Sequence, residues 1–135
     1  MYRKISVLIC LALFSACSLK GREAPPEDVD KAMLLFFQRL EAAQYEKIWD
    51  DSAESFKKIS QKTEVLESLK QMAAMGKATT PARVEMYFKD EEGKRAAFPK
   101  YAVHFEQSNA SVLFKFVDEK GEWKMGAFEV RQRPS

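Results

Sequence analysis

The sequence predicts an α+β domain in which helices come first and an antiparallel sheet of about four strands follows. Two observations predict this order. Apolar residues recur every three or four positions across residues 29–73, which is the period of helices buried on one side. From residue 84 onward they recur at every second position, which is the period of strands with two different faces. The length of 135 residues suits a single domain.

Residues 1–16 are expected to form a signal peptide that is absent from the mature protein. Arg3 and Lys4 give a cationic start, and residues 5–16 are apolar or small. A helix of that length reaches about 18 Å, well short of the roughly 30 Å of hydrocarbon in a bilayer. The segment therefore favours a signal peptide over a transmembrane helix, and its removal also removes Cys10.

The cleavage region ends at a cysteine, Cys17. Residues 14–17, Phe-Ser-Ala-Cys, resemble a lipobox, whereas a conventional signal peptidase prefers a small residue where Phe14 stands. The resemblance implies a diacylglycerol thioether and usually an N-acyl chain on Cys17, which together anchor a protein firmly. An inner-membrane retention signal would resemble Asp at the position after the cysteine, so Ser18 implies the outer membrane, facing the periplasm, if the host is Gram-negative. The alternative is an incidental cysteine near an ordinary cleavage site.

The mature chain is expected to be close to neutral. Arg3 and Lys4 are the only charged residues before Cys17, which leaves 20 basic against 20 acidic residues from there on. Nucleic-acid binding needs clustered positive charge, so no nucleic acid is expected as a partner. Cys17 would be the only cysteine of the mature chain, which excludes an intramolecular disulfide.

Residues 17–28 are expected to form a lipidated tether, and residues 29–133 to form the folded domain. Gly21 and Pro25 favour an irregular tether. Pro26, followed by two acidic residues, marks the start of a first helix. One face of this helix is expected to be buried, and it consists of Val29, Ala32, Met33, Leu35, Phe36, Phe37 and Leu40.

Three shorter helical segments are expected after the first helix. A short helix is predicted at residues 44–50, and a further helical turn at residues 56–59. Ser60 is expected to cap a longer helix that runs to Ala73. Gly76 is expected to end that helix in the left-handed conformation.

The second half of the chain predicts the strands. The alternating apolar sets are Val84, Met86 and Phe88, then Tyr101, Val103 and Phe105, then Val112, Phe114 and Phe116, and last Trp123, Met125 and Ala127. Residues 91–94 and 118–121 contain glycine and charged residues typical of hairpin turns. The last strand is expected to continue through Phe128 to Val130.

Two motifs carry a resemblance to a known group of proteins. They are residues 40–45, Leu-Glu-Ala-Ala-Gln-Tyr, with Trp49, and residues 121–128, Gly-Glu-Trp-Lys-Met-Gly-Ala-Phe. Across residues 29–130 the chain resembles the nuclear-transport-factor-two-like superfamily, also called SnoaL-like. Within it the chain is most similar to a family of uncharacterised bacterial domains found in secreted proteins and lipoproteins. The resemblance implies a cone fold, with helices on a curved antiparallel sheet, and leaves the function open.

Five side chains are candidates for lining a cavity, namely Tyr45, Trp49, Tyr101, His104 and Trp123. Histidine side chains can act as general bases near physiological pH, but no acid in the sequence is placed to orient His104 as a base. We therefore favour a histidine on the solvent-facing or dimer-facing side of the sheet. Tyr45 and Trp49 are four residues apart, which more often indicates a packing contact, and Trp123 is interpreted in the same way.

No catalytic residue is assigned. Glu85 and Glu129 are strand carboxylates that could act as acid or base. Isomerases of this fold place an aspartate and a tyrosine in the cone, and no residue pair of this chain can be matched to theirs position by position. The sequence contains no phosphate-binding glycine loop, no metal-ligand spacing and no nucleophile elbow. Neither a metal nor a cofactor is expected.

The sequence therefore predicts an envelope-anchored lipoprotein whose domain binds an apolar small ligand or an envelope protein without catalysis. One alternative is a cone-fold enzyme acting on a small hydrophobic molecule, with His104, Tyr101 or a strand carboxylate as its base. Another is a structural or assembly role, in which the open sheet face pairs two copies or docks on an envelope complex. The expected partners are the membrane, through the lipid anchor, the apolar ligand or envelope protein, and a second copy in a homodimer.

Overall fold

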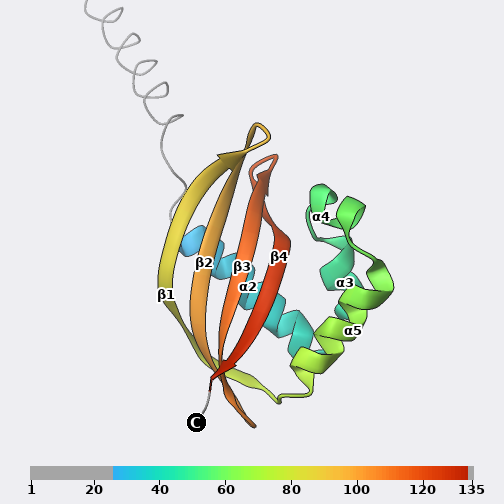
Figure 1. Cartoon of the computed structure of the whole chain (residues 1–135), viewed down its shortest axis with the longest axis vertical. Coiled ribbons are helices and arrows are strands. Elements are labelled where there is room, and N and C mark those ends of the chain that lie inside the picture. Colours follow the sequence, from blue (N-terminus) through green and yellow to red (C-terminus); the bar gives the residue numbers. More distant parts are fainter. Residues whose placement is uncertain (1–25, 134–135) are drawn as a thin grey trace, which may run out of the picture.

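The structure is a computed structural model that describes residues 26–133 (Figure 1). The expected signal peptide, Cys17 and the tether up to residue 25 lie outside these residues. The helices are α2 (Pro26–Glu41), α3 (Tyr45–Asp50), α4 (Glu54–Ile59) and α5 (Lys62–Ala73). The strands are β1 (Ala78–Glu91), β2 (Lys94–Phe105), β3 (Asn109–Glu119) and β4 (Glu122–Arg133). The predicted α+β class, with helices first and strands after them, is confirmed.

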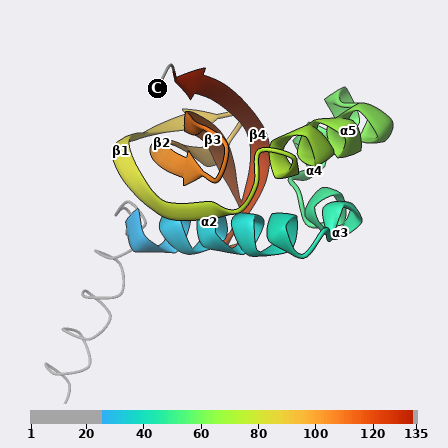
Figure 2. The same cartoon turned by 90° about the horizontal axis from the view of Figure 1, so that it is seen from below.

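The strands form one antiparallel sheet in the order β1-β2-β3-β4, because each strand is joined to the next by a short turn. The sheet is curved and does not close (Figure 2). Helix α2 lies across one face, here called the inner face, whereas α3, α4 and α5 gather beside β4. The opposite face is called the outer face. No helix of residues 26–133 is long and apolar enough to cross a membrane.

The core lies between α2 and the inner face of the sheet, and Phe114 of β3 is at its centre. Phe114 is 3% exposed. Its ring contacts four other aromatic rings at centroid distances of 5.0 to 6.0 Å, those of Phe36, Phe37, Tyr101 and Phe116. The rings of Phe36 and Phe37 belong to α2, so Phe114 joins this helix to the sheet.

Strand β4 contains a bulge that the alternation did not predict. The register between β3 and β4 shifts between Lys115 and Phe116, so that Gly126 is an extra residue in β4. Met125 therefore shares the inner face with Phe128, which pairs with Phe114, and Ala127 lies on the outer face. The expectation that Ala127 continues the apolar set of Met125 was wrong.

Three other local expectations were also wrong. Ser60 ends α4, since its N–H donates to the carbonyl of Phe56, and Gln61 precedes α5 as its N-cap residue. Val84 is 59% exposed because a second irregularity, between Arg83 and Glu85, takes it out of the alternation. Leu35 is 44% exposed because it lies at the flank of α2, where none of the other described elements covers it fully.

Candidate functional site

A groove lies between α2 and the hairpin formed by β3 and β4, and we call it the α2–hairpin groove. Its volume is about 450 Å³, which is within the range of small-molecule sites. The residues that line it are Lys31, Ala32, Leu35, Phe36 and Arg39 of α2, Ile48 and Asp51 at α3, and Phe116, Glu122, Trp123, Lys124 and Met125 of the hairpin.

The floor of the groove is apolar and is part of the core. Phe36, Phe116 and Met125 are buried, and Phe36 packs edge-to-face on Phe114 in the centre of the fold. Leu35 and Trp123 stand above this floor and are partly exposed. A rigid floor with two accessible apolar side chains can take up an apolar ligand without rearranging the core.

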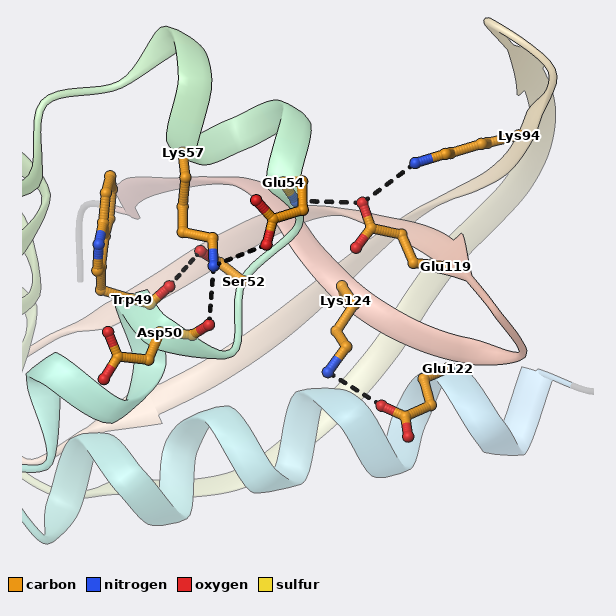
Figure 3. A network of polar contacts seen from close by, with 9 residues as sticks. All are labelled: Trp49, Asp50, Ser52, Glu54, Lys57, Lys94, Glu119, Glu122 and Lys124. Carbon is orange, nitrogen blue, oxygen red and sulfur yellow. Dashed lines mark hydrogen bonds and ion pairs between the residues drawn. The ribbon is translucent and has the colours of Figure 1, made fainter.

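The rim of the groove is charged, with three cationic and two acidic side chains. Arg39 forms an ion pair with Asp51 at 2.5 Å. Lys124 forms an ion pair with Glu122 at 2.9 Å, and Figure 3 shows this pair between the hairpin and α2. Lys31 is exposed and has no ion pair with any residue from 26 to 133. Two of the three cations of the rim are therefore neutralised by ion pairs, and the third, Lys31, is not.

Contacts on the other side of the hairpin fix its position. The carboxylate of Glu119 accepts a hydrogen bond from the backbone N–H of Glu54 at 3.1 Å and binds Lys94 at 3.4 Å (Figure 3). Helix α4 has no side-chain cap of its own, so Glu119 satisfies its N-terminus from a distant strand. The N–H of Ala53 also donates to the carbonyl of Met125 at 2.8 Å. These bonds hold the β4 side of the groove in place.

The five candidate side chains from the sequence are not brought together in one site. Trp123 lines the α2–hairpin groove, with its ring centroid 6.1 Å from that of Phe88. Trp49 packs on Phe56 at 6.0 Å, outside the groove. Tyr45 lines a different hollow, near the end of α2 and the start of β1.

Tyr101 is fully buried on the inner face and takes part in a three-residue polar network. Its hydroxyl donates to Asp30 Oδ1 of α2 at 2.7 Å, and Arg83 of β1 donates to Asp30 Oδ2 at 3.1 Å. Burial raises the pKa of Tyr101 above its ordinary value of 10.0, and the hydrogen bond to Asp30 raises it further. The hydroxyl therefore stays protonated at physiological pH and joins β2 to the first turns of α2.

The remaining candidates for acid–base chemistry lie on the surface of the sheet. His104 is exposed, and its Nδ1 is hydrogen-bonded to Oδ1 of Asn109 at 2.6 Å. No carboxylate of residues 26–133 is bonded to it, and its exposed position on the sheet is the one that the sequence favoured. Glu85 and Glu129 are exposed and lie on the outer face. Within residues 26–133 no cluster of three histidine, cysteine or acidic residues could hold a metal ion.

Comparison with known proteins does not add to this geometry. No protein-family model matches the chain, and no curated protein matches it. The resemblance to the cone-fold superfamily therefore stays a prediction.

The sequence reasoning missed most of the groove. Lys31, Leu35 and Arg39 are four residues apart and form one stripe along α2, next to its buried face. The sequence did contain one indication of the groove, because this helix has more apolar residues than one buried face can accommodate. A leucine between two cations on that flank is the pattern that could have indicated a partly exposed binding stripe.

Proposed function

We propose that the chain is the precursor of an outer-membrane lipoprotein, anchored through Cys17 and facing the periplasm. Its domain is a cone-fold binding module without catalytic activity, and its ligand site is the α2–hairpin groove. The observation that carries this proposal is the pair of partly exposed apolar side chains, Leu35 and Trp123, above a floor of core residues. An open apolar groove with a few polar groups at its rim is typical of small-molecule sites.

The ligand is a small molecule with an apolar body and one negative charge. The buried floor favours the apolar body. Arg39 and Lys124 are already paired with acids, whereas Lys31 is available at the rim for an anionic group. A carboxylate or phosphate attached to an apolar chain satisfies both parts of the groove.

Binding without catalysis is supported by the state of the acidic groups. Asp51 and Glu122 are the carboxylates of the groove, and each is held in an ion pair. Tyr101 is protonated and hydrogen-bonded to Asp30. None of these groups is oriented as a free general base toward the groove.

Mutation of α2 tests the ligand site. Trp49→Phe leaves Trp123 as the only tryptophan, so that its fluorescence reports on the groove during titration with decanoate or uncharged decanol. Both probes are expected to change the emission in a saturable way. Lys31→Glu should weaken decanoate binding roughly threefold to tenfold and leave decanol unaffected, because only decanoate carries a charge. Leu35→Asp should abolish binding of both probes.

Leu34→Asp is the matched control for this experiment. Leu34 is 46% exposed and Leu35 is 44% exposed, and both belong to α2, but only Leu35 lines the groove. Equal losses in the two variants would show that the effect is not specific to the groove. No saturable change with either probe would contradict the proposed ligand class.

The anchor is tested separately by the intact mass of the mature protein isolated from its own membrane. The chain is expected to begin at Cys17 and to carry the mass of a diacylglycerol group and an acyl chain. The physical reason is that a lipidated cysteine becomes the first residue after cleavage and holds the protein in the bilayer. An unacylated N-terminus at any other residue would refute lipidation without affecting the groove.

A further inference from the structure

Strand β1 forms an edge of the sheet that no other described element pairs with. It is the first strand in the sheet order and is bonded to β2 alone. Figure 1 shows it at the left margin, away from α3, α4 and α5, which lie beyond β4. The opposite edge is partly occupied, since the N–H of Ala53 donates to the carbonyl of Met125 in β4. Unpaired strand edges are templates for pairing with another chain.

The two halves of β1 differ in their suitability for pairing. The first half contains Pro81, a positive φ of 43° at Thr80, and register shifts before Ala82 and before Glu85. Such irregularities block an edge. Residues 85–91, in contrast, pair with β2 residue by residue without interruption. This half offers a regular and unblocked edge.

The hairpin turn determines which backbone groups of β1 face outward. Glu92 and Gly93 both have positive φ, 50° and 77°, as a two-residue turn requires. In such a turn the backbone groups of the flanking residues, Glu91 and Lys94, are hydrogen-bonded to each other. From there along the strands, hydrogen-bonded pairs alternate with pairs that are not hydrogen-bonded to each other. The N–H and C=O groups that point away from β2 in this half of β1 are those of Met86, Phe88 and Asp90.

We propose that β1 pairs edge to edge with β1 of a second copy of this chain. The two strands are antiparallel and centred on Tyr87, so that two four-stranded sheets become one continuous sheet. In this register Met86 lies opposite Phe88 of the partner subunit, and the outward backbone groups of both residues bond across the interface. The proposal goes beyond the binding function of the groove and does not require it.

The charges of β1 are complementary in this register. Glu85 lies opposite Lys89 of the partner subunit, and symmetry makes a second such pair on the other side of Tyr87. A shift of two residues in one direction would place Glu85 opposite Glu91, and a shift in the other would place Glu85 opposite Tyr87, where it has no counter-charge. Like charges directly opposite each other are destabilising, so the register centred on Tyr87 is favoured over its neighbours.

The apolar side chains of this half of β1 also benefit from pairing. Tyr87 is 55% exposed, although its ring stacks on Phe98 at a centroid distance of 4.9 Å. Met86 and Phe88 are partly exposed on the inner face. A second β1 strand beside them removes part of this apolar surface from water.

Exchange of the charged pair tests the proposal. The chain from residue 17 with Cys17→Ser retains the complete described core and is unlipidated. Sedimentation equilibrium of this protein is expected to show a dimer. Glu85→Lys and Lys89→Glu should each raise the dissociation constant roughly tenfold or more, since each places like charges at both symmetric positions. An equimolar mixture of the two variants should form a heterodimer about as strong as the original dimer.

Glu129→Lys is the control, because Glu129 is exposed on the outer face of β4, at the other edge of the sheet. This variant is expected to dimerise like the unmodified chain, and thermal unfolding checks that every variant is folded. A monomer up to the solubility limit would overturn the proposal. So would a dimer that resists both β1 variants, or a mixture of the variants that fails to associate.

Discussion

Replacement of Phe114 by alanine should lower the free energy of unfolding by about 3–5 kcal/mol, the largest loss that we expect from a single core substitution. Phe114 is 3% exposed and its ring contacts four other rings, one of which belongs to Tyr101 on the neighbouring strand. Helix α2 supplies two of these rings, Phe36 and Phe37. Alanine would leave a cavity where the helix meets the sheet, and the surrounding rings can close it only in part. Urea denaturation measures the loss.

Phe98→Ala is the matched control for Phe114→Ala. Phe98 is also a phenylalanine in a central strand, but it is partly exposed on the outer face, where it stacks on Tyr87. We expect its loss to be smaller, about 1–2 kcal/mol, because fewer buried contacts disappear. Equal losses at the two positions would contradict a core centred on the inner face.

The protein should lose stability above about pH 10 through the titration of Tyr101. Burial and the hydrogen bond to Asp30 raise the pKa of Tyr101 in the folded state above the value of 10.0 expected in the unfolded chain. Between these two pKa values the unfolded chain has released the proton and the folded chain has kept it. The stabilisation is therefore complete below the unfolded pKa and falls as the pH rises, by up to about 1.4 kcal/mol per pH unit.

Tyr101→Phe separates this effect from general alkaline denaturation. The variant should cost about 1–2 kcal/mol at neutral pH, because Asp30 loses one of its hydrogen-bond donors and keeps Arg83. It should then lose less stability than the original chain between pH 9 and pH 11, since it has no hydroxyl at this position to titrate. Urea denaturation across this pH range measures both effects. Parallel curves for the two proteins would contradict the role of Tyr101.

The helices and strands followed from local periodicity. Val29, Met33, Phe36 and Leu40 are buried on α2 as their spacing predicted. Tyr101, Val103 and Phe105 are buried on one face of β2. The turns lie within the predicted segments 91–94 and 118–121, but the second one has two residues where four were expected, because Asp118 and Glu119 still pair with β4. These features depend on residues close together in the chain, and so the sequence alone predicts them.

Two of the errors lie where two distant segments have to match each other. Gly126 looks like an ordinary strand residue until β4 is placed against β3, which leaves no partner for it. Val84 is exposed for the same reason, at the irregular register between β1 and β2. A bulge is a property of a strand pair, and periodicity in one strand does not reveal it.

The sequence by itself determined the class of the fold, and it led to the expectations of a near-neutral mature chain and of a lipid anchor at Cys17. Only the tertiary structure decided which side chains are accessible and what lies beside them. Trp123 was a candidate, yet Leu35 and Lys31 become its neighbours only when α2 packs against the hairpin. Likewise the Tyr101 hydroxyl meets Asp30 only across the interface between sheet and helix. Contacts of this kind depend on packing between segments distant in the chain, which a local pattern does not encode.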